Sequence, residues 1–153
     1  MFANRVLALL VAAWFGAYVM AGYGVAPLLF QSLPKEQAGT LAGMLFGAVN
    51  YIGLFVWAVV YLAGVSARRQ SFGRGGNSKL SARLVAFTWL LLAVSQFLLV
   101  PVIRALRTGQ THWLPNLLGG EMGFWHGLSS SLYMLVSLLG LVLLMRLLRF
   151  EWH

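Results

Sequence analysis

Charged side chains divide this chain into four long apolar stretches. No Lys, Arg, Asp or Glu occurs within residues 6–34, 37–67, 84–103 and 122–145. A helix needs about 20 apolar residues to cross the roughly 30 Å hydrocarbon core of a bilayer, and each stretch is long enough. None shows the apolar–polar alternation of a barrel strand, and an open sheet would leave backbone groups unpaired in hydrocarbon. The pattern predicts four membrane-spanning helices, approximately at residues 6–32, 38–65, 82–106 and 121–149.

The composition is that of a chain that lies mostly in lipid. Apolar residues make up 60% of the 153 residues and charged residues only 9%, against about 45–50% and about 25% in soluble domains. At this length we expect a single transmembrane domain over residues 1–153. The predicted fold is therefore all-α, an integral membrane four-helix bundle made of antiparallel hairpins.

The first stretch resembles a secretory signal peptide in one respect, because Arg5 precedes an apolar run. The run continues without a charge to Pro34, which is too long for the apolar region of an ordinary signal peptide. Pro27 also follows directly after the nearest small-residue cleavage pattern, at 24–26. We therefore expect this stretch to be retained as the first span.

The Lys and Arg side chains lie close to the ends of the apolar stretches, and their distribution predicts an orientation. Only Lys35, Arg104 and Arg107 fall on the side of the connections at 32–37 and 108–120. The remaining basic residues fall on the side of both termini and the 66–81 connection. Because cytoplasmic loops carry an excess of Lys and Arg, we expect a multi-pass protein of a bacterial inner membrane with both termini in the cytoplasm.

The net charge of +8 and the pI near 10.9 also occur in proteins that bind nucleic acids. No long soluble segment is present here to hold a polyanion, so we expect no nucleic-acid partner. The expected partners are the lipid bilayer and either further copies of the chain or another membrane protein. The chain has no Cys, which excludes disulfides and thiolate metal sites.

Glycines recur every four residues at the start of the second and fourth predicted helices. Small residues at this spacing let two helix backbones approach closely in a membrane, where lipid tails are as apolar as Leu. We therefore predict a tightly packed outward half, with the packing either within one chain or between copies. The predicted packing residues are Gly39, Gly43, Gly47, Gly119, Gly123 and Gly127.

Two prolines fall inside predicted spans, near their outward ends. Pro27 lies in the first span and Pro101 in the third. Proline removes a backbone donor and kinks a helix. Two interpretations remain open: the prolines only set helix curvature, or carbonyls freed near them line a small polar cavity.

Four polar side chains near the outward ends of the third and fourth helices form a candidate ligand-binding site. Gln96 and Arg104 share a helix face. Arg104 needs a partner if it is partly buried, and Glu121 is one of only three acidic residues in the chain. His126 can change its charge near neutral pH. The structural alternative is a charge pair that only joins the two helices, or an arginine that reaches to the lipid headgroups.

Other chemistry finds little support in the residues. A bis-histidine haem needs two imidazoles at matching depth on facing helices, and the first three predicted helices contain no histidine. A closed zinc site needs three or four Cys, His or carboxylate ligands. We find no nucleophile–base arrangement and no phosphate-binding loop. We therefore predict no catalytic residues, no metal site and no cofactor.

Three segments resemble a known family of membrane proteins. Residues 25–30, 37–39 and Phe46 resemble the first hairpin of the transmembrane protein 205-like family, and residues 101–107 resemble its third helix. Residues 125–129 (WHGLS) resemble the start of its last helix. The resemblance implies a four-helix membrane protein, of a kind found in bacteria and eukaryotes, whose biochemical activity is not established.

Three functions are consistent with these observations. The first is a non-enzymatic membrane component, such as a scaffold, an assembly factor or a subunit. The second is a small transporter or ligand-binding protein that uses the polar site at the periplasmic ends of the third and fourth helices. The third is a redox subunit that binds haem or quinone.

Overall fold

The computed structural model describes residues 2–70 and 76–149, with side chains described over residues 5–66 and 82–147. Every regular element in these ranges is helical, and none is a strand. Several basic residues used above to predict the orientation lie outside the described side chains. They are Arg68, Arg69, Arg74, Lys79 and Arg149.

The helices form four long rods and one short segment. The first rod joins α1 (Phe2–Val19), η1 (Met20–Val25) and α2 (Ala26–Ser32), and the second is α3 (Lys35–Gln70). The third rod joins α4 (Gly76–Val94), η2 (Ser95–Leu99) and α5 (Val100–Arg107), and the fourth is α7 (Met122–Arg149). The short helix α6 (Trp113–Leu118) lies in the connection between α5 and α7.

Four helices in the described part of the chain are long and apolar enough to cross a membrane. They cover Arg5–Ser32, Lys35–Ser66, Ala82–Arg107 and Met122–Leu147. The prediction of four helices long and apolar enough to cross a membrane is confirmed. The first three rods begin earlier than predicted, and the second and third also end later. Only Leu33 and Pro34 separate the first two rods, and the chain reverses its direction there. Pro34 directly precedes α3, a position that tolerates the missing backbone donor of proline.

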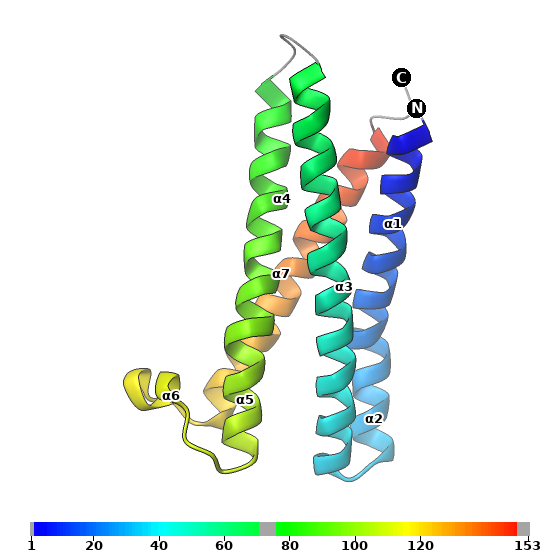
Figure 1. Ribbon diagram of the computed structural model, residues 1–153. Coiled ribbons are helices and arrows are strands. Elements are labelled where there is room, and N and C mark those ends of the chain that lie inside the picture. The colour runs from blue at the N-terminus through cyan, green and yellow to red at the C-terminus, as the bar shows by residue number, and fades with distance from the viewer. Residues whose placement is uncertain (1, 71–75, 150–153) are drawn as a thin grey trace.

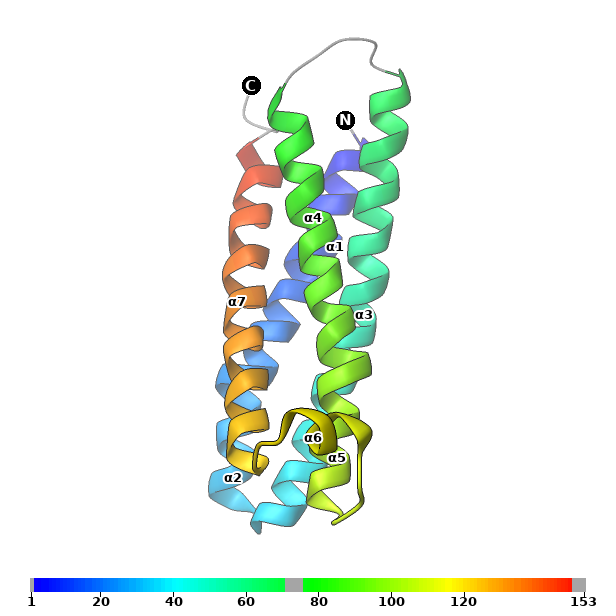
Figure 2. The ribbon, with the colours of Figure 1, turned by 90° about the vertical axis from the view of Figure 1, so that its left-hand side faces the viewer.

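The four rods lie side by side and alternate in direction (Figures 1 and 2). Helix α3 packs against both α1 and α4, and α7 packs against the same two helices. We call the end with the Ser32–Lys35 turn and α6 the α6 end, and the end where α1 begins the far end. Figure 1 shows α6 projecting to one side of α5 at the α6 end.

The main core lies toward the far end and is built around two indole rings. Trp14 and Trp57 are almost fully buried and meet edge to face, with ring centroids 5.5 Å apart. The Trp14 Nε1 donates a hydrogen bond to the main-chain oxygen of Val49 at 2.9 Å, so this indole needs no contact with water. Gly53 makes room for it, because a Cβ there would lie 2.5 Å from the Trp14 Nε1.

Each in-span proline follows a short π-helical segment. Pro27 is preceded by η1 and Pro101 by η2. A proline ring clashes with the carbonyl four residues earlier, and a wider π turn is one way for a helix to continue past such a clash. Each rod therefore continues past its proline through a π-helical segment instead of ending there.

Four of the six glycines predicted to pack helices together have no other helix against them within the described part of one chain. A Cβ at Gly43, Gly119, Gly123 or Gly127 would meet nothing within 4 Å, and Gly119 caps the end of α6 with φ +72°. Among the described residues of one chain, these four glycines therefore make no close contact with another helix. A packing role for these glycines between copies stays a prediction.

The remaining two predicted packing glycines face long side chains of the third rod and not another backbone. A Cβ at Gly39 would lie 3.0 Å from the Arg107 guanidinium, and one at Gly47 would lie 4.0 Å from the Gln96 Nε2. Three other glycines, Gly22, Gly53 and Gly140, lie against side chains of other helices. Each of these three glycines makes room for an aromatic ring, from Tyr133, Trp14 and Phe15 respectively.

Candidate functional site

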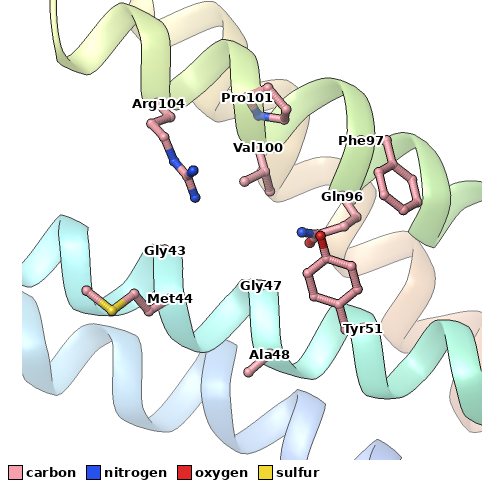
Figure 3. Close-up of a pocket in the computed structure, with 10 residues that line it drawn as sticks. All are labelled: Gly43, Met44, Gly47, Ala48, Tyr51, Gln96, Phe97, Val100, Pro101 and Arg104. Carbon is pink, nitrogen blue, oxygen red and sulfur yellow. The ribbon is translucent and has the colours of Figure 1, made fainter.

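A cleft of about 400 Å³, which we call the α3–α5 cleft, opens between α3 and the η2 and α5 parts of the third rod (Figure 3). One wall is α3, with Gly43, Met44, Gly47, Ala48 and Tyr51. The other wall is formed by Gln96, Phe97, Val100, Pro101 and Arg104.

Short side chains on α3 explain why the cleft exists. Gly43, Gly47 and Ala48 line it with little or no side chain, and a Cβ at Gly43 would meet no atom within 4 Å. On the opposite wall, Pro101 lies where η2 gives way to α5. Gly43 and Gly47, two of the glycines predicted to bring helices together, therefore leave space inside this chain.

The inner part of the cleft is polar and rests on a buried pair of amides. Asn50 is only 1% exposed, and its Nδ2 donates to the Ser95 Oγ and the Gln96 Oε1, both at 3.3 Å. The Gln96 carbonyl oxygen is therefore occupied by α3, which leaves the Gln96 Nε2 group as a donor beside Gly47. Within the described residues the Asn50 Oδ1 has no hydrogen-bond partner, so this polar group lies in the interior without a matching donor.

Two arginines on α5 place positive charge at the α6 end. Arg104 lines the cleft and is exposed, and its side chain extends from α5 toward α3 (Figure 3). Arg107 lies one turn further on, with its guanidinium beside Gly39. Both belong to the last turn of α5, where a cation is favourable with respect to the helix dipole.

The structure brings together two of the four predicted site residues. Gln96 and Arg104 line the same cleft, whereas Glu121 and His126 do not. No ion pair joins Arg104 to Glu121 in the described part of the chain. The main-chain oxygen of Glu121 caps the start of α7, where it accepts hydrogen bonds from the backbone N–H groups of Phe124 at 3.0 Å and Trp125 at 3.3 Å. Both the Glu121 and His126 side chains are exposed.

The register of α7 explains why His126 lies outside the cleft. Trp125 is the residue that faces α5, where it packs with Leu99, Val102 and Leu114 in a second, smaller core. Successive residues of an α-helix are rotated by about 100°, so the next residue, His126, turns away from α5. Its main-chain oxygen accepts a hydrogen bond from the Ser130 Oγ at 3.0 Å.

The sequence analysis did not include Asn50 in the predicted site. A signal for Asn50 was present, because Asn50 and Gln96 are isolated amides in otherwise apolar spans and such groups seek partners in lipid. Tyr133 serves the core instead. Its ring stacks on Tyr18 with centroids 4.0 Å apart, and its hydroxyl donates to the Tyr18 main-chain oxygen.

Comparison with known protein families gives a match that covers both walls of the cleft. The family model described as a domain of unknown function, DUF4149, matches residues 9–112, more than half of the chain. The chain belongs to the DUF4149 family. No curated protein and no solved structure matches it. Both walls of the cleft fall inside the DUF4149 match, while Glu121 and His126 fall outside it.

Proposed function

We propose that this DUF4149 protein is a non-enzymatic membrane component whose α3–α5 cleft binds a small ligand that enters from the bilayer. The cleft is the observation that carries the proposal. Its volume of about 400 Å³ falls within the range of roughly 300–1,000 Å³ for small-molecule sites. Its walls are mostly apolar with a few polar groups, which is the usual character of such a site.

The lining of the cleft supports binding and not catalysis. Its polar side chains are an amide, a phenol and a guanidinium, from Gln96, Tyr51 and Arg104. General acid–base or nucleophilic catalysis needs a base near neutral pH or an activated nucleophile. Among the residues whose side chains the structure describes, no Ser, Cys, His, Lys or carboxylate lines the cleft, so we assign it no reaction.

The membrane arrangement is part of the proposal. We infer that the four helices cross a bacterial inner membrane as an antiparallel bundle, with the α6 end in the periplasm and both termini in the cytoplasm. The bias of Lys and Arg along the sequence supports this orientation. Helix α6 supports the position of the surface, because Trp113, Leu117 and Leu118 are exposed on it and aromatic residues favour the membrane interface.

We also propose kinship with the transmembrane protein 205-like family, supported by the segments quoted above. The proposed partners are the bilayer and either further copies of the chain or another membrane protein. The exposed stripe at Gly123 and Gly127 is available for such contacts. Nucleic acid is not among the proposed partners.

The orientation can be tested by single-cysteine labelling, because the chain contains no native Cys. Gln110→Cys lies at the α6 end and Ser66→Cys at the far end, and both positions are exposed. A membrane-impermeant maleimide should label Gln110→Cys in intact spheroplasts and Ser66→Cys only after permeabilisation. The opposite labelling pattern would overturn the proposed orientation.

The binding function can be tested by filling the cleft. Gly43→Leu places a side chain into the open space of the cleft, and Gly64→Leu is its matched control on the same helix, because a Cβ there also meets nothing within 4 Å. We expect native mass spectrometry to detect a small ligand on the wild type and on Gly64→Leu but not on Gly43→Leu. Equal occupancy in all three proteins would overturn the proposal.

A further inference from the structure

We infer that the ligand of the α3–α5 cleft is an anionic amphiphile, with a phosphate or carboxylate against Arg104, an acceptor oxygen at Gln96 and a hydrocarbon chain along the apolar walls. This inference rests on the proposed function, because it names the class of molecule that the same cleft takes. It concerns the sign of the ligand's charge and the order of its polar and apolar parts.

The polar side chains that line the cleft present mainly donors, from Arg104, Gln96 and the Tyr51 hydroxyl. A guanidinium carries five N–H donors and has no acceptor. The Gln96 Oε1 already accepts from Asn50, so the amide of Gln96 offers its Nε2 hydrogens to the cleft. No Asp or Glu lines the cleft to attract a cation. A ligand that matches these groups must accept hydrogen bonds, and opposite Arg104 it must carry negative charge.

The two donors lie at different depths along the third rod. Arg104 lies one turn before Arg107, the last residue of α5, which is about 4.5 Å from that end at 1.5 Å per residue. Gln96 precedes Arg104 by two turns, or about 12 Å along the helix. Arg104 is therefore close to the level where an arginine reaches lipid headgroups, and Gln96 lies well inside the span.

The walls between and around these donors are apolar and open to the side. Met44 and Phe97 line the cleft and are 62% and 60% exposed, so the cleft opens on the surface that faces lipid in the proposed arrangement. Val100 and Pro101 complete the apolar wall. A free ion would leave this surface unmatched, whereas the chain of an amphiphile can extend along it and continue into the bilayer.

The size of the cleft limits how much of the ligand it holds. About 400 Å³ lies near the lower end of the range for ligand sites. We therefore expect the headgroup and the first part of one chain to occupy the cleft, with the remainder of the molecule among the bilayer lipids. A fatty-acid carboxylate and a glycerolipid phosphate share the negative charge that Arg104 requires, and the ester oxygens of the glycerolipid also supply an acceptor for Gln96.

The test compares probes of different charge on the purified full-length protein in nanodiscs of neutral phosphatidylcholine. The probes are oleate, phosphatidate, uncharged oleyl alcohol and inorganic phosphate. Binding is measured from the melting temperature, since a ligand that prefers the folded state raises the midpoint. We expect oleate or phosphatidate to bind at least about tenfold more tightly than oleyl alcohol, and inorganic phosphate alone to give no shift.

Arg104→Gln removes the charge at the cleft, and Arg107→Gln is the control, because Arg107 lies on the same helix but does not line the cleft. We expect Arg104→Gln to weaken the anionic probes about tenfold, as for the loss of one charge-assisted hydrogen bond, with oleyl alcohol unaffected. Arg107→Gln should weaken them by less than about twofold. Each variant's melting temperature without a probe shows whether it is folded.

The outcomes separate this inference from the proposed function. The inference is overturned if oleyl alcohol binds as tightly as oleate, if the two arginine variants behave alike, or if inorganic phosphate alone gives the full shift. If Gly43→Leu abolishes binding of oleate and oleyl alcohol alike while Arg104→Gln has no effect, the cleft binds ligands without selecting anions. If Gly43→Leu leaves every probe bound, the cleft is not the site and both proposals fail.

Discussion

The half of the molecule toward the far end is filled by aromatic rings, whereas the α6 half leaves a cleft between α3 and α5. The difference arises along one helix, α3, which carries small residues in both halves. At Gly53 an indole from α1 fills the space, but at Gly43 no side chain does. The same residue type is therefore a close packing contact in one half and an opening in the other, depending on what the neighbouring helix supplies.

The largest expected effect comes from removing the ring that fills the closed half. Trp14→Ala should lower the free energy of unfolding by about 3 kcal/mol, the lower end of the range for a buried Trp in a soluble core, because lipid already provides an apolar medium. The variant also loses the hydrogen bond to Val49. Denaturation by sodium dodecyl sulfate in mixed micelles measures this change, and a loss under 1 kcal/mol would show that the indole is not central to the core.

A smaller effect, and a direct comparison of the two halves, comes from adding one methyl group to each glycine. Gly53→Ala forces the Trp14 ring to shift and should lower the free energy of unfolding by about 1–3 kcal/mol, as overpacking does. Gly43→Ala should leave it unchanged within about 0.5 kcal/mol or raise it, because alanine favours the helix. The same denaturation assay applies, and equal effects at the two positions would contradict the comparison.

The amide pair at the inner part of the cleft should contribute less. Asn50→Ala and Gln96→Ala each remove one side of a buried hydrogen bond, and hydrogen bonds between membrane helices are worth about 0.6 kcal/mol on average. The double-mutant cycle should therefore give a coupling energy of about 0.5–1 kcal/mol. A coupling energy of zero would mean that the two amides do not interact in the folded protein.

The smallest effect is expected for the charge pair that sequence reasoning favoured. Arg104→Gln and Glu121→Gln should each change the free energy of unfolding by less than about 0.5 kcal/mol, because both side chains are exposed and such surface positions contribute little. Their double-mutant cycle should give no coupling energy. A coupling above about 1 kcal/mol would reinstate the predicted pair and remove Arg104 from the cleft.

The sequence alone was sufficient for the features that depend on one helix at a time. The charge-free stretches predicted four spanning helices, and the positions of Pro27 and Pro101 indicated where the rods deviate from regular α-helix. Residues 108–120 contain Trp113 and Pro115, and their apolar content agrees with the exposed apolar face of α6.

Features that depend on how two helices meet were harder to predict. Gln96 and Arg104 were placed together because they lie on one helix, whereas the positions of Glu121 and His126 depend on how α7 is turned toward α5. The contacts of Trp125 with Leu99 and Val102 fix that rotation. The spacing of residues in the sequence does not show whether Trp125 or His126 faces α5. The partner of Gln96, Asn50, comes from a different helix in the same way.

The π-helical segment η2 has a consequence for which residues can reach the cleft. In a regular α-helix, positions eight residues apart differ by about 80° around the axis, whereas positions seven apart differ by only about 20°. A π turn accommodates about one additional residue without the rotation that residue would normally add. The step from Gln96 to Arg104, which passes through η2, therefore closes nearly two whole revolutions. If η2 were a regular α-helical turn with the same number of residues, the guanidinium would swing out of alignment with the amide by about a quarter turn.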